Sequence, residues 1–445
     1  MILDTRRLAG FAEAAFCVFA LSMFLGAYAG LPLRVEGVSV KGGGTNPYNA
    51  AAMALVLVGT VTFLTARWGR LLFVARHGGL INVFILMAAI SVLWSTDPWV
   101  SGRKVMSLIQ TVAFAYYLAA SHPVERVIRF TAAALGISMV ISAAVAIGIP
   151  SVGIMSSPGL AGNWNGVYPH KSGLGAATAL SVLFFGWLWR NEPGRRWLHA
   201  PMLLLSLFLA IMAHSRTAQV TIGMMVCLVI FLPLLRLPGL ARIWAVYGVL
   251  LAAFALVTLL YLYFNPVMEA LGKDPSLTGR VPTWLGLLDM AWEKPLGGYG
   301  YSGFFINALP EIEDVWRRAG WTMWSAHSAL IEMMLALGIP GAVVTLWAML
   351  EMLVRSLLLW AGGTHRWASL ALVYGVVCLA IAPVESLLFS GGDIHTVLFP
   401  LIYVLLRIAG ARSAAATRVV APRSHRPIDP HYGLGRPGAD PVARS

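Results

Sequence analysis

Charged side chains are scarce in this sequence. Of its 445 residues, 58% are hydrophobic and only 11% are Asp, Glu, Lys or Arg. An ordinary soluble domain does not have that balance, and many apolar runs near twenty residues long are typical of a polytopic membrane protein. Because the runs are continuous rather than alternating, they predict membrane-spanning helices. The expected fold class is an all-α polytopic membrane protein.

Cysteine and metal-binding motifs are also nearly absent. Cys17, Cys227 and Cys378 each lie within an apolar run, where a small buried hydrophobe is expected rather than a disulfide or a metal ligand. The sequence has no His-Glu-x-x-His, Cys-x-x-Cys or Walker-type motif, and the pair Asp393 and His395 is expected to be structural. We therefore predict no metal and no cofactor. The net charge of +13 is attributed to membrane orientation rather than to nucleic acid.

About twelve apolar segments are long enough to span a membrane. They fall near 9–30, 49–66, 79–95, 105–120, 127–149, 172–189, 199–214, 217–235, 242–264, 327–351, 368–389 and 394–409. With the amino terminus inside, about two thirds of the 32 lysines and arginines lie in inner loops and in the carboxy-terminal tail. The positive-inside rule therefore predicts that both termini are cytoplasmic.

This orientation divides the chain into four parts. Residues 1–264 hold transmembrane helices 1–9, residues 265–326 form a large periplasmic loop lobe between spans 9 and 10, residues 327–410 hold helices 10–12, and residues 411–445 form a basic cytoplasmic tail. The tail is rich in Arg, Pro, Ala and Gly, so we expect it to be disordered. The lobe is rich in Arg, Gly, Trp and carboxylates, and we expect it to form half of an active site.

Arg216 is the first candidate site residue. It lies in an outer turn, where the positive-inside rule argues against a casual arginine. The apolar segment before it, residues 201–213, is only about 20 Å long at 1.5 Å per residue, so Arg216 is expected at or below the outer membrane surface. Ser215 is expected to cap the next helix, and an arginine beside a helix amino terminus suits a phosphate group. The alternative is an interfacial arginine that reaches lipid head groups.

Arg280 and His327 mark the two ends of the lobe. Arg280 follows Gly279, which lets a ligand approach the backbone closely, and Pro282 favours a helix start. His327 can take or give a proton near neutrality, because the unperturbed pKa of histidine is about 6.5. A loop arginine paired with a nearby acid and a plain interfacial histidine are the alternatives, and the residues alone do not decide between them.

Further outer-face residues are candidates for substrate binding. Lys171, preceded by His170, can hold a phosphate as a point charge, and Arg103 has a similar place after an earlier outer loop. Ordinary interfacial polarity is the alternative for all three. Glu311 and Asp314 belong to an acidic run in the lobe, which either binds acceptor sugar or solvates the lobe.

Taken in order, short motifs along the chain resemble the O-antigen ligase and Wzy-type polysaccharide polymerase superfamily, particularly its exopolysaccharide polymerase branch. The motifs are Trp94-Ser95 with Asp97-Pro98, His170-Lys171-Ser172, Ser215-Arg216-Thr217-Ala218, Thr278-Gly279-Arg280 with Trp284, Pro295-Leu296-Gly297 with Gly300, and His327-Ser328 followed by Glu332 and Gly338. About twelve spans with one large outer loop before the tenth also match. The family usually has His-Asn in the last motif, whereas this chain has Ser328.

The resemblance implies a metal-independent, inverting glycosyltransferase of the bacterial inner membrane. It would polymerise undecaprenyl-diphosphate-linked repeat units into exopolysaccharide or O-antigen at the periplasmic face. Arg216 and Arg280 would stabilise the departing diphosphate, and His327 would orient or deprotonate the acceptor hydroxyl. The implied partners are the lipid-linked oligosaccharide, membrane lipids, and a chain-length regulator or export proteins, with no nucleic acid.

Two other functions stay open at this point. A ligase that transfers the finished glycan to lipid A core or another acceptor uses the same chemistry. A polysaccharide transporter or flippase would form no bond, and Glu332 and Glu385 would then be its coupling acids. Against the transporter, the sequence shows no paired half-spans with internal symmetry.

Overall fold

The structure is a computed structural model, and it describes residues 5–28, 47–157, 159–241, 243–244, 247–248, 280–305, 310–319, 325–386 and 388–420. Within these residues the chain is almost entirely helical. The helices are α1 (Thr5–Phe24), α3 (Pro47–Thr65), α4 (Trp68–Arg76), α5 (Leu80–Ser91), α6 (Pro98–Ser121), α7 (Val124–Gly148), α8 (Pro150–Gly153), α9 (Lys171–Asn191), α10 (Arg196–Met212), α11 (Arg216–Phe231), α13 (Arg280–Glu293), α14 (Pro310–Ala319), α15 (Ala329–Ala361), α16 (Ala368–Ile381) and α17 (Ile394–Val420). Short 3-10 turns follow α5 (Val92–Trp94), precede α10 (Pro193–Arg195) and follow α11 (Leu232–Arg236).

The predicted membrane character is confirmed, although the number of spans is not. Eight described helical stretches are long and apolar enough to cross a membrane, or nine when α4 and α5, which meet at 93°, count as one broken span. Every predicted span except 242–264 coincides with a described helix, and that segment lies almost entirely outside the described residues. The total of about twelve therefore stays a prediction.

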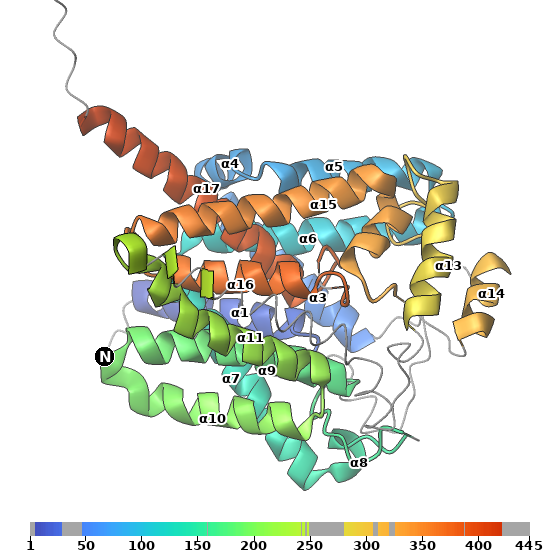
Figure 1. Cartoon of the computed structure of the whole chain (residues 1–445), viewed down its shortest axis with the longest axis horizontal. Helices are drawn as coiled ribbons and strands as arrows, with labels where there is room; N and C mark the ends of the chain where they lie inside the picture. The colour runs from blue at the N-terminus through green and yellow to red at the C-terminus, as the bar shows by residue number, and fades with distance from the viewer. Residues whose placement is uncertain are drawn as a thin grey trace, which may run out of the picture.

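The helices form one elongated bundle with two distinct ends (Figure 1). The first turns of α1 and the last turns of α17 lie at one end, here called the terminal end. Helices α13 and α14, which come from the predicted lobe, stand at the opposite end, here called the lobe end. The described ends of the chain therefore lie at the same end of the bundle, and their predicted cytoplasmic location stays a prediction.

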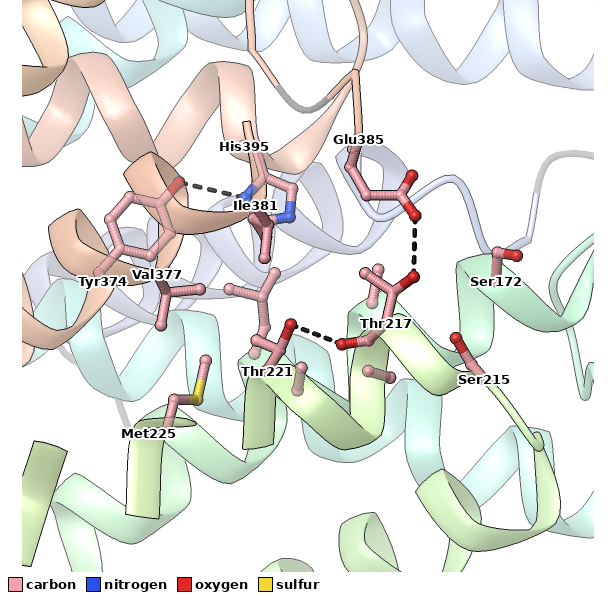
Figure 2. Close-up of a pocket in the computed structure, with 14 residues that line it drawn as sticks. Ser172, Ser215, Thr217, Thr221, Met225, Tyr374, Val377, Ile381, Glu385 and His395 are labelled. Carbon is pink, nitrogen blue, oxygen red and sulfur yellow. Dashed lines mark hydrogen bonds between the residues drawn. The ribbon is translucent and has the colours of Figure 1, made fainter. Parts of the chain in front are cut away.

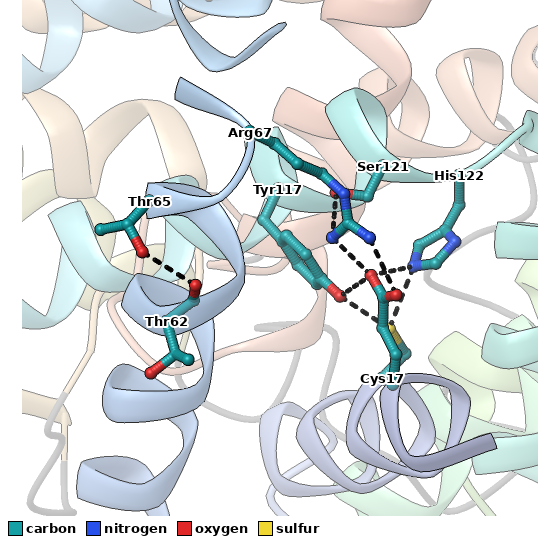
Figure 3. A network of polar contacts seen from close by, with 8 residues as sticks. Cys17, Thr62, Thr65, Arg67, Tyr117, Ser121 and His122 are labelled. Atoms are coloured by element: carbon teal, nitrogen blue, oxygen red, sulfur yellow. Dashed lines mark hydrogen bonds and ion pairs between the residues drawn. The ribbon is translucent and has the colours of Figure 1, made fainter. Parts of the chain in front are cut away.

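A partly buried polar network joins α1 to the start of α4 and the end of α6 near the terminal end (Figure 3). The Arg67 guanidinium donates to both carboxylate oxygens of Glu13, at 2.6 and 2.9 Å, and the Tyr117 hydroxyl donates to the same carboxylate at 2.7 Å. His122 Nε2 lies 3.5 Å from Glu13 Oε1 and 3.5 Å from Cys17 Sγ. A carboxylate within a span needs such partners, because the membrane interior supplies none.

The Trp-Ser-x-Asp-Pro motif docks the lobe onto the bundle. Asp97 caps α6 by accepting from the Val100 N–H at 3.0 Å, and Pro98 occupies the first turn. Trp94 Nε1 donates to the Gly297 carbonyl at 3.0 Å, and Thr96 Oγ1 donates to the Gly303 carbonyl at 2.9 Å. The motif therefore has a structural role in joining the lobe to α6.

Helix α15 is interrupted at Gly338, where the lobe segment that begins at Pro295 packs against it. Gly338 has φ 72°, and a Cβ placed on it would lie 2.5 Å from the Pro295 carbonyl oxygen, so only glycine fits. The next residue, Ile339, donates its N–H to that carbonyl at 2.7 Å. The lobe also has an apolar core of its own, formed around Leu287, Phe304 and Ile312.

Two predicted boundaries differ from the structure. The apolar segment before Arg216 is not short: with its 3-10 turn it runs for 20 residues, from Pro193 to Met212, and Pro201 lies inside α10. A proline inside a membrane helix is tolerated where neighbours satisfy the freed backbone group. Helix α17 continues to Val420 because its last turns are rich in alanine, and the part of the predicted tail after Val420 lies outside the described residues.

Candidate functional site

Arg216 is the first residue of α11, at a helix amino terminus that its own serine does not cap. Ser215 occupies the capping position, but its side chain makes no capping hydrogen bond, so that prediction is wrong. The reason is packing: a Cβ on Gly175 of α9 would lie 2.6 Å from both Cβ and Oγ of Ser215, so the serine side chain faces α9. The Arg216 side chain is exposed, and the residue lies at the helix amino terminus, where the helix dipole is positive.

Close crossing of α9 and α11 brings a second cation to Arg216. Lys171 begins α9, and its Nζ donates to the His214 carbonyl at 3.4 Å, in the turn just before Arg216. His214 itself has φ 47°, a left-handed backbone that non-glycine residues seldom adopt. Lys171 and Arg216, which the sequence offers only as separate candidates, therefore lie close together at the crossing of the two helices.

His170 lies beside the same cluster. Its Nδ1 accepts from the Ser172 N–H at 3.2 Å and caps α9. The pKa of His170 is lowered from its ordinary value, first because the surrounding protein desolvates the ring and then because Lys171 and His327 add positive charge nearby. A lowered pKa favours the neutral ring at neutral pH, so His170 acts there as a hydrogen-bonding group rather than as a cation.

His327 faces a carboxylate that comes from the connection between α16 and α17. Its Nδ1 lies 4.0 Å from Oε2 of Glu385, and the two side chains are 34% and 21% exposed, so both reach the surface of the site. The other oxygen of Glu385 accepts from Thr217 Oγ1 at 3.1 Å (Figure 2). Because Thr217 follows Arg216 directly, Glu385 connects the histidine to the arginine helix.

The helix that starts at Arg280 is also tied to the histidine segment. Trp284, one turn into α13, donates its Nε1–H to the Ala326 carbonyl at 2.9 Å. Pro282 lies in the first turn of α13, as predicted. The side chain of Arg280 lies outside what the structure describes, so its predicted role stays a prediction.

A narrow cavity of about 60 Å³ extends from this cluster between α9, α11 and α16 (Figure 2). Its lining is mostly small or apolar, and Thr217 and Glu385 lie on its polar side. Deeper along the wall, His395 Nδ1 and the Tyr374 hydroxyl are 3.2 Å apart. Asp393 accepts from the backbone N–H of His395 at 2.7 Å, which supports the structural role predicted for that pair.

The remaining predicted residues are not joined to the cluster by any contact among the described residues. Arg103 lies on α6 with its guanidinium 5.9 Å from the ring centre of exposed Trp99. Glu311 and Asp314 belong to α14, but their side chains lie outside what the structure describes. Their predicted roles in substrate binding are untested.

Sequence reasoning missed Glu385 as a site residue. From the sequence, Glu385 is a candidate only as a coupling acid of a transporter, whereas in the structure its carboxylate lies between His327 and Thr217. A lone acid near the end of an apolar run is a usable signal, because such residues in membrane segments are rare and usually functional. Its partner could not be read from sequence, since 58 positions separate it from His327.

The fold and the site together define a polytopic membrane protein with a cationic, histidine-containing cluster at one end of its helix bundle. A family model described as O-Antigen ligase matches residues 201–346, a stretch that contains Arg216, Arg280 and His327. The chain is also similar to the exopolysaccharide production protein ExoQ of Rhizobium meliloti (strain 1021), with 24% identity over 348 residues, covering 70% of this chain and 77% of that protein. The predicted resemblance to the O-antigen ligase and Wzy-type superfamily is therefore confirmed, and it implies a membrane glycosyltransferase-like enzyme of polysaccharide biosynthesis.

Proposed function

We propose that this protein is an inverting glycosyltransferase that polymerises undecaprenyl-diphosphate-linked repeat units into exopolysaccharide or O-antigen at the periplasmic face of the bacterial inner membrane. The observation that carries the proposal is the approach of Lys171 to the turn of Arg216, next to the pair of His327 and Glu385. Similarity to an exopolysaccharide production protein favours polymerisation over other uses of the same site.

The cations fit the donor. A diphosphate carries its charge at the membrane surface, and Arg216 at the start of α11 offers a guanidinium together with the positive end of a helix dipole. Lys171 adds a point charge, and Arg280 is expected to close the site from the lobe. These groups would stabilise the departing diphosphate without a metal. The cavity between α9, α11 and α16 would take the first part of the lipid chain.

His327 fits the acceptor. In the proposed step, an acceptor hydroxyl oxygen attacks the anomeric carbon from the face opposite the diphosphate. The new carbon–oxygen bond forms as the bond to the diphosphate breaks, the configuration inverts, and the hydroxyl proton passes to the His327 imidazole. Glu385, 4.0 Å from Nδ1, would stabilise the imidazolium that results. Undecaprenyl diphosphate leaves with the electron pair.

A ligase is the second candidate function. The matched family model is described as O-Antigen ligase, and the same cluster would serve transfer of a finished glycan to lipid A core or to another acceptor. A deletion strain distinguishes the two. Loss of a polymerase leaves single repeat units attached to their acceptor, whereas loss of a ligase leaves long chains unattached.

The direct test is an in vitro assay with the purified full-length protein and an undecaprenyl-diphosphate-linked oligosaccharide. The proposal expects longer lipid-linked glycans and release of undecaprenyl diphosphate, undiminished by a metal chelator. Movement of the lipid-linked glycan across a vesicle membrane without release of undecaprenyl diphosphate would instead identify a transporter.

A further inference from the structure

The peptide of Ala326 is held on both sides by side chains from distant elements. Trp284 Nε1–H of α13 donates to its carbonyl oxygen at 2.9 Å, and Glu332 Oε2 of α15 accepts from its N–H at 2.8 Å. Ala326 is only 1% exposed, so neither backbone group can turn to water instead. The residue before His327 is therefore fixed in place.

This clamp lies next to a strained backbone. His327 has φ 46°, in the left-handed region that L side chains seldom adopt and that persists only where the surroundings hold it. On the other side, the Ala329 N–H donates to the Ala382 carbonyl at 2.8 Å. Hydrogen bonds before and after His327 thus hold the conformation that turns its ring toward Glu385.

Glu332 also holds the segment that carries Glu385, the carboxylate that faces His327. The same Oε2 atom accepts from Ser386 Oγ at 2.8 Å, and Ser386 directly follows Glu385. One carboxylate oxygen therefore holds both sides of the pair formed by His327 and Glu385. Trp284 connects this point to α13, whose first residue is Arg280.

We propose that Trp284 and Glu332 are positioning residues, which hold His327 against Glu385 and in register with the helix that begins at Arg280. Glu332 acts as a hydrogen-bond acceptor within the protein and does not exchange a proton with substrate. The effect of the clamp on transfer rests on the proposed function, whereas its effect on the conformation of His327 does not.

The first test measures that conformation without any substrate. Trp284→Phe removes the indole N–H and keeps most of the ring, and Trp292→Phe on the same helix, where Trp292 is 61% exposed, is the matched control. Diethyl pyrocarbonate modification of the full-length protein, resolved by peptide mass spectrometry, gives the rate at His327. We expect that rate to rise about threefold or more in Trp284→Phe, because the loop opens more often, and to stay unchanged in Trp292→Phe. Equal rates at His327 in the two variants overturn the proposal.

The second test separates positioning by a hydrogen bond from an effect of charge. Glu332→Gln keeps an acceptor oxygen, and Glu332→Leu does not. In the transfer assay, kcat is expected to fall about tenfold to a hundredfold in Glu332→Leu and in Trp284→Phe, with KM for the donor little changed, and to stay near wild type in Glu332→Gln. Because both residues hold one peptide, the double variant should lose little more than the worse single variant.

Equal losses in Glu332→Gln and Glu332→Leu would assign the effect to charge and contradict the proposed role of Glu332. If the wild-type protein releases no undecaprenyl diphosphate, the proposed function fails. The modification rates at His327 still decide whether the clamp exists.

Discussion

At the terminal end of the bundle, Arg67 donates two hydrogen bonds to Glu13, and Arg355 and Arg407 both bind Glu351. At the lobe end, Lys171 lies by the turn of Arg216, and among the described residues no carboxylate pairs with either. The difference shows what each set of cations does. A cation that must stay in a helix bundle is neutralised within the protein, whereas adjacent cations without an acid are suited to an anion that arrives from outside.

The comparison extends to the backbone. The terminal-end networks connect regular helices, while the lobe-end cluster includes His214 and His327, both with φ near 46°. Strained residues of this kind gather at functional sites, where the surroundings hold side chains in a required direction. Four predictions test the contrast, in order of decreasing effect.

The largest effect is expected from Arg216→Ala. It removes a guanidinium that is proposed to stabilise the departing diphosphate, so the transfer rate should fall about a hundredfold to a thousandfold, while thermal unfolding stays unchanged. Glycan transfer and melting of the purified protein measure the two quantities. Arg280→Ala is expected to behave similarly. Near-normal transfer by both variants would show that the site is wrongly assigned.

Arg67→Ala should show the opposite behaviour. Glu13 is 13% exposed, and removing its ion-pair partner leaves a carboxylate with too few partners, which costs about 3 kcal/mol of unfolding free energy. Transfer per folded molecule should stay near the wild-type value. Chemical unfolding in detergent, together with the transfer assay on the folded fraction, measures this. A loss of transfer with unchanged stability would remove the contrast between the two ends.

Gly175→Ala tests whether the close crossing of α9 and α11 sets the spacing of the cations. The added Cβ would meet Ser215 at 2.6 Å and Ala218 at 3.0 Å, which should cost about 1 to 3 kcal/mol and raise KM for the donor. Gly186→Ala on the same helix is the control, because nothing lies within 4 Å of its Cβ position. Equal KM values for the donor in Gly175→Ala and Gly186→Ala would show that the helix crossing does not set the spacing of the cations.

Glu192→Gln should have the smallest effect, and the effect should depend on pH. Burial raises the pKa of Glu192, but hydrogen bonds from Arg129 and His199 outweigh it, so the pKa lies below its ordinary value of 4.5. A lowered carboxyl pKa contributes stability above about pH 4.5 that is lost as the pH falls through the folded value. We expect at most about 1 kcal/mol, because Arg129 is half exposed. Melting temperatures of wild type and variant should converge on acidification, and a constant difference contradicts this account.

Much of the fold follows from local pattern. Long apolar runs and the scarcity of charge predicted the helices at nearly the right positions, because the membrane interior allows few other backbone arrangements. The predicted span 105–120 starts later than α6, which already begins at Pro98 with Asp97 as its cap. One error concerns the apolar segment before Arg216, which is longer than expected because the helix continues through Pro201.

The site was only partly predictable. Arg216 and His327 stood out because a cation or a histidine at an outer helix start is unusual whatever surrounds it. Glu385 and the clamp on Ala326 did not stand out, since their meaning lies in partners from other helices. Ser215 is a similar case. Its sequence context predicts a helix cap, but its side chain packs against Gly175 of α9 instead.

The sequence by itself determined that this protein is a helical membrane protein, and that arginine, lysine and histidine side chains are available at one end of the bundle. These properties depend on composition and on spacing within single segments. Only the tertiary structure decided which cation lies beside Arg216, which acid faces His327, and which residues hold that histidine in a strained backbone. Such pairings join residues far apart in the chain, and they are set by how the helices cross rather than by any segment alone.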